Sequence, residues 1–527
     1  MNNQAVRSIG VLWLVCVSLV QAETRPNIII MMVDDLGYSD FGCYGSEIKT
    51  PHIDKLAENG IRFQQFHNTA KCHSSRVSLL TGLYSDQAGD SKLNRGVTIA
   101  EVMKKAGYAT MMVGKWHLAK EPTDRGFEKY FGHLSGATNF FKGDKTFRLN
   151  GKSWSDFGDD FYTTDANIEY ATRFLGETIK ESPDKPFFLY IAHNAPHYPL
   201  HVKKADYDKY QGVYEAGWDQ LRKARHQKQI NMGLIPKDWK QAPRPKLVPA
   251  WSSLTDKEKA WDVRRMMAFA GMVDSIDQTT GKLIQFLKAK KSYDNTLIMI
   301  CSDNGACPFD RTRNGDKDPW NPESYWCYDT GWSHVGNVPF RLHKQNQHGG
   351  GVNSPMIAHW PKGIKAKPGS VTPQRAHLID YMATCIDLAG TEYPKSWPGI
   401  ELEPLQGKSL KPIFEGETRK PHDSLFFRYN TNRALIQGDW KIVTHRASRW
   451  ELYNIVKDGT EMNNLAAQHP EKVKVLSTLW HKLAKDQGRL KGKSAAQVSE
   501  KTPPLLKKSG VPANSAGNKG GKGRKRS

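Results

Sequence analysis

The segment 71–82 brings together two side chains that could act on an anion. Cys72 and Arg76 are four residues apart, so a helix that begins here would present the thiol and the guanidinium on one face. A helix N-terminus attracts anions, because its free N–H groups and its dipole are both positive. A polar pocket that holds both side chains at such a helix end would therefore suit a tetrahedral oxyanion. The alternative, from this motif alone, is a buried cysteine before an amphipathic helix whose arginine reaches solvent.

Oxygen-bearing side chains follow two predicted buried strands. The apolar run 27–33 ends in Asp34 and Asp35, and the run 295–301 leads to Asp303 and Asn304. Because α/β folds place ligands at the carboxyl ends of strands, these four side chains could converge. Carboxylate and amide oxygens suit Ca²⁺, and less well Mg²⁺. Taken alone, the Asp34-Asp35 pair could instead be a turn with solvated carboxylates.

A lysine and a histidine follow a third predicted strand. The strand 108–113 delivers Lys115 and His117, which are two residues apart and can face one cleft. Lys344, shortly before the glycine run 349–351, is a further candidate contact for an anion. Each of these residues, taken in isolation, could equally be an ordinary surface lysine or a core histidine.

Three histidines follow the predicted strand 187–192 with the spacing of a zinc-binding helix, namely His193, His197 and His201. Prolines at 196 and 199 exclude a regular helix here, so we reject a zinc site. We expect one histidine at a cleft, and His197 is the best candidate.

The order of these elements predicts an α/β protein with a large mixed, mostly parallel sheet flanked by helices. Predicted helices over 98–106 and 268–287 alternate with the strands, and a last strand of this sheet covers 356–361. From about residue 421 the pattern changes to short strands and tight turns before a helix over 470–486, which indicates a small antiparallel α+β domain. We therefore expect the following units: a signal peptide (1–22), a catalytic domain (23–415), a C-terminal antiparallel sheet and helix domain (416–488) and a basic disordered tail (489–527).

The first 22 residues predict export. Arg7 supplies a positive start, an apolar run over 9–20 follows, and Val20-Gln21-Ala22 is a small-residue cleavage site. No later segment approaches a membrane-spanning length, so we expect an exported chain, periplasmic or secreted, without a membrane span. A membrane anchor is the alternative for this segment. In an oxidising compartment Cys307 and Cys327 would be the pair expected to form a disulfide.

The protein is strongly basic, with a formal charge of +22, of which the tail 489–527 contributes +10 because its eleven Lys and Arg stand against Glu500 alone. A basic body favours polyanionic partners such as sulfated glycans, whereas the export signal disfavours nucleic acid. The oligomeric state stays open. Trp320, Trp326 and Trp332 lie in the insertion 304–339, and we expect them either to form a wall that stacks on a sugar or aryl ring or to pack as an ordinary loop.

These motifs together resemble those of type I sulfatases, the arylsulfatase branch of the alkaline phosphatase superfamily, over residues 25–486. The matching segments are Asp34-Asp35-Leu36-Gly37, Cys72-x-x-x-Arg76 with Leu80-Thr81-Gly82, Gly114-Lys115-Trp116-His117, Pro196-His197, Ser302-Asp303-Asn304-Gly305, Pro339-Phe340-Arg341-x-x-Lys344, Gly438-Asp439-Trp440-Lys441 and Trp450-Glu451-Leu452-Tyr453.

The resemblance implies hydrolysis of a sulfate ester by a formylglycine that a maturation enzyme makes from Cys72. In the family the hydrated aldehyde attacks sulfur and expels the alcohol, and the aldehyde then re-forms with release of sulfate. The resemblance also implies a role for each residue. Ca²⁺ would be held by residue 72 together with Asp34, Asp35, Asp303 and Asn304, and Arg76 would orient the hydrate. Sulfate oxygens would be bound by Lys115 and Lys344, and the leaving oxygen would be stabilised or protonated by Lys344 and His197. Asp303 would assist the attack, and His117 would take the proton that releases sulfate.

Two positions depart from the family pattern. Ser74 stands where members usually carry Pro or Ala, which bears on how efficiently Cys72 is matured, and Gly349 stands where they usually carry Glu, which predicts a local structural change. The expected substrate is a sulfated polysaccharide, a sulfated oligosaccharide or an aryl sulfate. The alternatives are a phosphoester or phosphonate hydrolase on the same scaffold, which would need ligands for a second metal, and a non-catalytic polyanion-binding relative.

Overall fold

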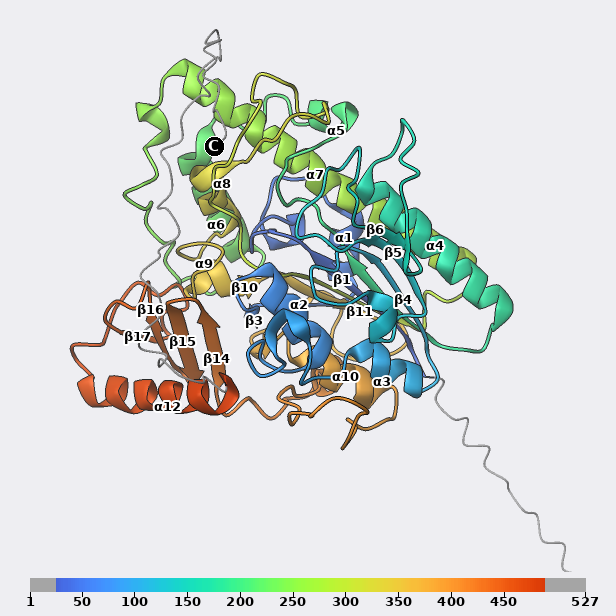
Figure 1. The fold of residues 1–527 in the computed structure, drawn as a ribbon. Coiled ribbons are helices and arrows are strands. Elements are labelled where there is room, and N and C mark those ends of the chain that lie inside the picture. The colour runs from blue at the N-terminus through green and yellow to red at the C-terminus, as the bar shows by residue number, and fades with distance from the viewer. Residues whose placement is uncertain (1–24, 489–527) are drawn as a thin grey trace, which may run out of the picture.

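A ten-stranded mixed sheet forms the centre of the computed structural model, which describes residues 25–488. The strand order is β12-β2-β11-β9-β1-β8-β4-β5-β6-β7 (Figure 1). The five central strands β9, β1, β8, β4 and β5 run parallel to one another, and β11, β2, β6 and β7 bring antiparallel pairings to the edges. The bounds are β1 (Asn27–Val33), β2 (Ile61–Phe63), β4 (Ala109–Gly114), β5 (Lys129–His133), β6 (Phe147–Leu149), β7 (Lys152–Ser153), β8 (Phe187–Ala192), β9 (Thr296–Ser302), β11 (Met356–His359) and β12 (Ser370–Thr372).

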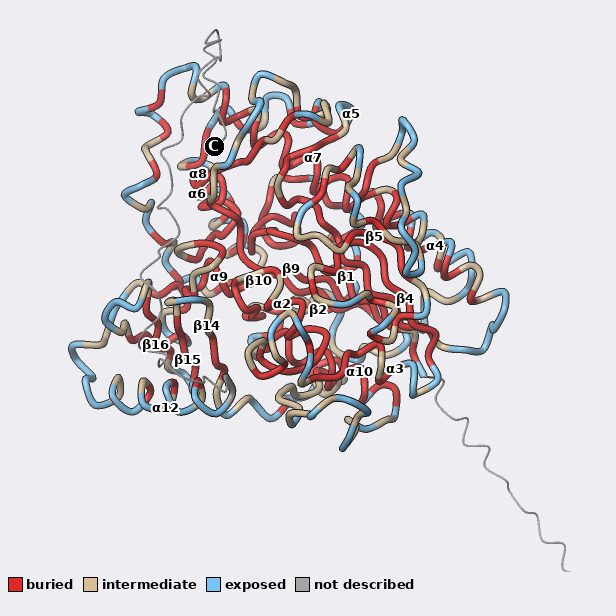
Figure 2. The backbone as a smooth tube through the Cα atoms, viewed as in Figure 1, coloured by how far each residue is buried: buried red, intermediate tan, exposed pale blue. Residues whose placement is uncertain are grey.

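Alternate side chains of the central strands point into two separate cores, as the pleat of a strand requires. On β1, Ile29 and Met31 pack in one core with helices α1, α4 and α7, whereas Ile28 and Ile30 pack in the other with α2, α3 and α10. Figure 2 shows the central strands buried, whereas α4 (Thr163–Glu181) carries exposed residues. The helices of these two layers are α1 (Pro51–Glu58), α2 (Cys72–Thr81), α3 (Ile99–Lys105), α4 (Thr163–Glu181), α5 (Lys204–Asp208), α6 (Gly217–Asn231), α7 (Asp256–Ala289), α8 (Asp329–Gly336), α10 (Asp380–Leu388) and α11 (Lys411–Phe414), and the short helix α9 (Gly349–Val352) lies outside both cores.

A four-stranded antiparallel sheet follows in the C-terminal part, with α12 (Pro470–Gly488) packed on it (Figure 1). Its strands are β14 (Leu425–Tyr429), β15 (Asn432–Gln437), β16 (Trp440–Thr444) and β17 (Glu451–Asn454). Their apolar side chains form a third core that also includes Ala70, Tyr84 and Val352 of the larger part. A small sheet of β3 (Phe66–His67), β10 (Asn353–Ser354) and β13 (Ala376–His377) lies near this contact.

The predicted mixed, mostly parallel sheet and the small antiparallel unit are both confirmed. Helix α7 is longer than predicted: it begins at Asp256, twelve residues before the predicted start, because Thr255 and Glu258 form a capping box at its N-terminus. The boundary expected near residue 415 stays a prediction. The predicted signal peptide and basic tail lie outside the described residues. Among the described helices, none combines the length and apolar character that a membrane crossing requires.

Candidate active site

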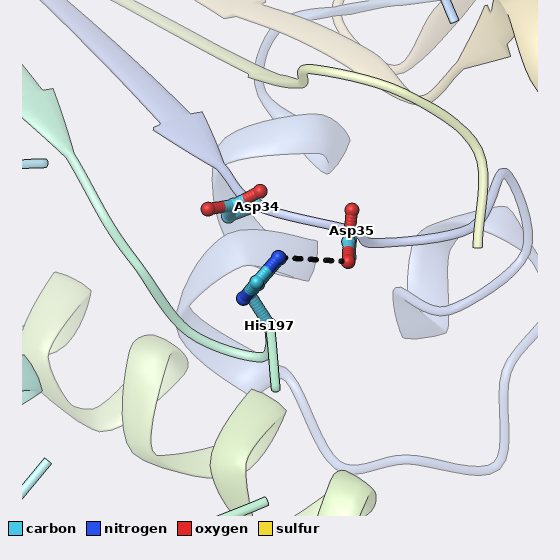
Figure 3. Close-up of side chains that lie close together, drawn as sticks. All are labelled: Asp34, Asp35 and His197. Carbon is cyan, nitrogen blue, oxygen red and sulfur yellow. Dashed lines mark ion pairs between the residues drawn. The ribbon is translucent and has the colours of Figure 1, made fainter. Parts of the chain in front are cut away.

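The predicted site residues come together at the carboxyl edge of the central sheet. Asp34 directly follows β1, Asp303 directly follows β9, and Lys115 directly follows β4. Because these strands are parallel and β8 lies between β1 and β4, their carboxyl ends meet at one edge. His197 follows β8 at the same edge and faces Asp35 (Figure 3).

Buried ion pairs hold this cluster together. The ammonium of Lys115 donates to Asp34 Oδ2, and that of Lys344 donates to Asp35 Oδ1. Burial opposes ionisation of Asp35, but Lys344 and His197 outweigh it and lower the pKa of its carboxyl group to about 2. Arg76 lies between Asp34 and Asp303. The cluster thus contains three acidic side chains (Asp34, Asp35 and Asp303) and three basic ones (Lys115, Lys344 and Arg76).

Three buried oxygen atoms of the cluster have no hydrogen-bond partner: Asp34 Oδ1, Asp35 Oδ2 and Asn304 Oδ1. Ligand atoms of Asp34, Asp35 and His197 lie within 4.8 Å of one another, and no other group of His, Cys, Asp and Glu in residues 25–488 meets this criterion for a metal site. Unpaired buried acceptors are costly unless a cation or water satisfies them. The donor set fits one hard divalent cation such as Ca²⁺.

Asp303 differs from the other three predicted ligands, because both of its carboxylate oxygens accept hydrogen bonds. The backbone N–H of Asp35 donates to Oδ1 at 3.2 Å, and Arg76 Nη2 donates to Oδ2 at 3.3 Å. Asn304 Nδ2 meanwhile donates to Asp35 Oδ1 at 2.7 Å, which directs its own oxygen elsewhere. Burial and the nearby Asp34 charge raise the pKa of Asp303 well above its ordinary value.

Cys72 is the first residue of α2 and its side chain is buried. Burial alone would raise the pKa of this thiol, but Lys115, Lys344 and Lys71 outweigh burial and lower it to about 6. The environment of residue 72 therefore stabilises negative charge, as the sequence predicts for this helix N-terminus.

Arg76 lies one turn further along α2 and faces the same cluster. Its Nη1 donates to the carbonyl oxygen of Lys115 at 2.9 Å, and its Nη2 contacts Asp303 and lies 3.6 Å from Asp34 Oδ2. The side chain is 1% exposed. The alternative in which Arg76 reaches solvent is therefore wrong.

Two histidines flank the cluster. His197 Nε2 lies 3.6 Å from Asp35 Oδ2, while its Nδ1 shares a hydrogen bond of 2.7 Å with the carbonyl oxygen of Tyr198. Burial lowers the pKa of His197 to about 4. Burial and the positive charge of Lys115 together lower the pKa of His117 to about 2. Both imidazoles are thus neutral at neutral pH and can exchange a proton with a bound group.

The zinc-binding helix rejected from the sequence is absent from the described segment 193–201, which is irregular. His201 Nε2 shares a hydrogen bond of 2.6 Å with the carbonyl oxygen of Ser324, so this histidine has a packing role. His193 is buried without a hydrogen-bond partner and is separate from the metal-site candidates.

Residues of the C-terminal sheet hold the loop that carries Lys344, a role that the sequence analysis did not assign to them. Arg341 Nη1 donates to Tyr453 Oη at 3.0 Å and to Glu451 at 3.3 Å, and His348 Nε2 lies 3.0 Å from the same carboxylate. The backbone N–H of Gly349 donates to Glu461 at 2.9 Å. These contacts join residues more than 100 positions apart, so no local spacing signals them.

Of the two alternatives for the tryptophans of the insertion 304–339, a substrate wall or ordinary packing, the structure shows packing. Trp326 and Trp332 are fully buried, packed edge-on against Trp261 and Trp218 respectively, and Trp320 packs against Tyr207. Trp326 and Trp332 form core rather than a wall for substrate, because the adjacent helices α7 and α6 supply their aromatic partners, and Trp320 is partly buried against that core.

Cys307 and Cys327 are free buried thiols and not the expected disulfide. Cys327 Sγ accepts a hydrogen bond from the backbone N–H of Arg311 at 3.3 Å. Both cysteines border the same small cavity beside Asp35.

Comparison with known proteins decides among the chemistries that this geometry allows. The model of the Sulfatase family matches residues 26–391, and the model of the N-sulphoglucosamine sulphohydrolase C-terminal region matches residues 342–489. The chain belongs to the sulfatase family. It is thus a sulfuric ester hydrolase built on a sulfatase fold, as the resemblance implied.

Individual sulfatases are similar over nearly their whole length. An uncharacterised sulfatase of Schizosaccharomyces pombe is 30% identical, with 87% of this chain and 94% of the relative covered. An arylsulfatase of Klebsiella aerogenes is 29% identical, with 79% and 95% covered. The crystal structure of Ps i-CgsB in complex with k-i-k-neocarrahexaose aligns with a TM-score of 0.65 at 25% identity, over 88% of this chain and 93% of that one.

Proposed function

We propose that this sulfatase hydrolyses the sulfate ester of a sulfated polysaccharide or oligosaccharide with a formylglycine at position 72 and one bound Ca²⁺. The observation that carries this proposal is the position of Cys72 at the start of α2, next to Lys115 and Lys344 and beside three unpaired buried oxygens. A cationic pocket around a nucleophile suits a group whose charge is spread over several oxygens.

The proposed Ca²⁺ would be held by Asp34, Asp35 and Asn304, which supply the unpaired oxygens, with Asp303 and residue 72 completing the set that the sequence predicts. When bound, it would acidify the hydrated aldehyde and offset the negative charge of the site.

The side chains of this chain would then bind and orient the sulfate group. Lys115 and Lys344 would exchange part of their contact with Asp34 and Asp35 for sulfate oxygens. Arg76, fixed by the Lys115 carbonyl oxygen and by Asp303, would orient the nucleophile. The attack on sulfur would be assisted by Asp303 as a base, consistent with the raised pKa of its carboxyl group.

Proton transfers are proposed for the two histidines. His197, together with Lys344, would protonate or stabilise the leaving alcohol oxygen, and the hydrogen bond of its Nδ1 with the Tyr198 carbonyl oxygen leaves Nε2 facing the site. His117 would take the proton when the aldehyde re-forms and sulfate leaves. A neutral His117 can accept a proton directly, whereas His197 can donate one from Nε2 only after it has itself been protonated there, because its Nδ1 proton is held by the Tyr198 carbonyl oxygen.

The glycan substrate class is proposed from the basic charge of the chain and from the likeness to Ps i-CgsB, a relative solved with an oligosaccharide. An aryl sulfate is the second candidate, supported by the likeness to the Klebsiella arylsulfatase. We further propose that the protein is exported to the periplasm or secreted, and that a maturation enzyme acts on Cys72. A two-metal phosphoester or phosphonate hydrolase is disfavoured, because only one candidate metal cluster occurs in residues 25–488.

The test combines mass spectrometry with sulfate release. Peptide mass spectrometry across residue 72 of protein from its native host should show conversion of the thiol to an aldehyde, and the same protein should release inorganic sulfate from 4-nitrophenyl sulfate or sulfated glycans. Cys72→Ala should abolish sulfate release, whereas Cys385→Ala, at a buried cysteine on α10, should retain it. Sulfate release by a protein whose Cys72 is unmodified would contradict the formylglycine mechanism.

A further inference from the structure

We propose that a pocket between α2 and the C-terminal sheet binds an uncharged sugar unit next to the one that carries the sulfate. This inference rests on the proposed glycan sulfatase function and deepens it. The pocket, which we term the β14 pocket, has a volume of about 210 Å³. The residues of its lining that matter for the argument are His73, Ser85, Asp86, Asp90, Arg428 and Tyr429.

The β14 pocket lies on the side where the catalytic cluster reaches the surface. Among the cluster residues, His117 alone is partly exposed, and the others are buried. The ring of His73, the residue after Cys72, is centred 6.0 Å from that of His117 and 6.3 Å from that of Tyr429. A chain of three rings thus leads from the cluster to the end of β14.

The charges of the β14 pocket are already paired within it. Asp86 accepts two hydrogen bonds of 2.6 Å from Arg428, and Asp90 accepts one of 2.8 Å from Ser85. His73 Nε2 lies 3.5 Å from the same Asp90 oxygen. The Arg428–Asp86 pair is therefore neutral as a whole, and the Asp90 carboxylate, which is hydrogen-bonded to an uncharged hydroxyl, would repel a second sulfate.

The chemistry of this lining suits hydroxyl groups on a ring. Carboxylate oxygens and the Ser85 hydroxyl can exchange hydrogen bonds with sugar hydroxyls, and the half-buried Tyr429 offers an aromatic ring as an apolar contact. Arg428 and Asp86 are each about a quarter exposed, so the pair is reachable from the pocket. The occupant that fits is a neutral sugar unit rather than a sulfated one.

The first test compares two substrates in matched variants. Tyr429→Ala should lower kcat/KM on a sulfated oligosaccharide about tenfold, mainly through KM, and should leave 4-nitrophenyl sulfate hydrolysis unchanged, because that compound reaches only the sulfate position. Tyr429→Phe should behave like the wild type, and so should the control Tyr393→Ala, at a half-buried tyrosine outside the β14 pocket.

The second test varies the charge of the neighbouring unit. A carrageenan oligosaccharide is compared in two forms, whose neighbouring galactose unit is either sulfated or unsulfated, because the unsulfated galactose carries no charge. The unsulfated form should be preferred at least about tenfold. Three outcomes would overturn the β14 pocket proposal. In the first, Tyr429→Ala lowers kcat/KM equally on both substrates. In the others, the enzyme prefers the substrate with the sulfated neighbour, or it acts on 4-nitrophenyl sulfate and on none of the oligosaccharides. Absence of any sulfate release would instead overturn the proposed function.

Discussion

The Glu461 carboxylate accepts a hydrogen bond of 2.9 Å from the backbone N–H of Gly349 and pairs with the buried ammonium of Lys441. Glu461 lies beyond β17, whereas Gly349 begins α9 shortly after Lys344. One carboxylate therefore links the C-terminal sheet to the loop that carries a proposed sulfate ligand. A side chain at position 349 would approach Phe340, since a Cβ there would lie 2.7 Å from its ring. The close approach of Phe340 therefore favours glycine at position 349.

Replacement of Glu461 should destabilise the protein. Glu461→Gln leaves the ammonium of Lys441 buried without a charged partner, which costs about 3–5 kcal/mol when a buried pair is broken. Urea unfolding should show this loss, whereas Glu471→Gln on the exposed face of α12 should change stability by less than about 0.5 kcal/mol. A Glu461→Gln protein as stable as the wild type would show that the pair contributes little.

Arg76→Lys should lose catalysis beyond what any loss of stability explains. A lysine cannot contact both the Lys115 carbonyl oxygen and Asp303, as the two guanidinium nitrogens do. We expect kcat on 4-nitrophenyl sulfate to fall about 100-fold or more. The matched control is Arg173→Lys on α4, whose arginine pairs with Glu177 at the surface. Activity within threefold of wild type in folded Arg76→Lys would contradict the orienting role.

Calcium should stabilise the folded chain through Asp34, Asp35 and Asn304. At a free Ca²⁺ concentration 100 times its dissociation constant, binding to the native state adds about 2.7 kcal/mol to the free energy of unfolding. Thermal unfolding with and without chelator measures this directly. Asp35→Asn should lose the stabilisation by Ca²⁺. The substitution should not strain the backbone, because the positive φ of 67° at residue 35 is compatible with asparagine. The exposed Asp156→Asn should keep it. A shift that persists in Asp35→Asn would place the ion elsewhere.

Acid should weaken the contact of α10 with the segment 408–422. Burial opposes ionisation of Asp380, but His422 and Arg419 hold its pKa below the ordinary value, with hydrogen bonds of 2.7 and 3.0 Å. Because the folded pKa is depressed, this stabilisation is present above the unfolded value of about 3.9 and is lost as the pH falls below it.

The test of this acid effect is urea unfolding between pH 3 and pH 7. Asp380→Asn should be less stable than the wild type at pH 7 and should lose less stability on acidification, whereas the exposed Asp423→Asn should follow the wild type. Equal slopes for Asp380→Asn and the wild type would exclude Asp380 as the titrating group.

Strand patterns and motif spacing predicted most of the cluster, because its members end strands of one parallel sheet. Asp34, Lys115 and Asp303 each directly follow a strand whose apolar run is readable, and parallel strands must bring such ends together. The start of α7 could also have been predicted from the sequence, since the capping box of Thr255 and Glu258 is a local signal.

Periodicity and short motifs are local properties, and they were enough to predict the α/β order, the residue types of the cluster and the resemblance to the sulfatase family. The folded arrangement was needed to show that both Asp303 oxygens are occupied, that Trp326 and Trp332 are core, and that Glu461 holds the Lys344 loop. These facts depend on side-chain contacts between segments far apart in the chain, whose pairing no local pattern encodes. The β14 pocket belongs to the same class, since β14 and α2 meet only when the C-terminal sheet packs against the larger part.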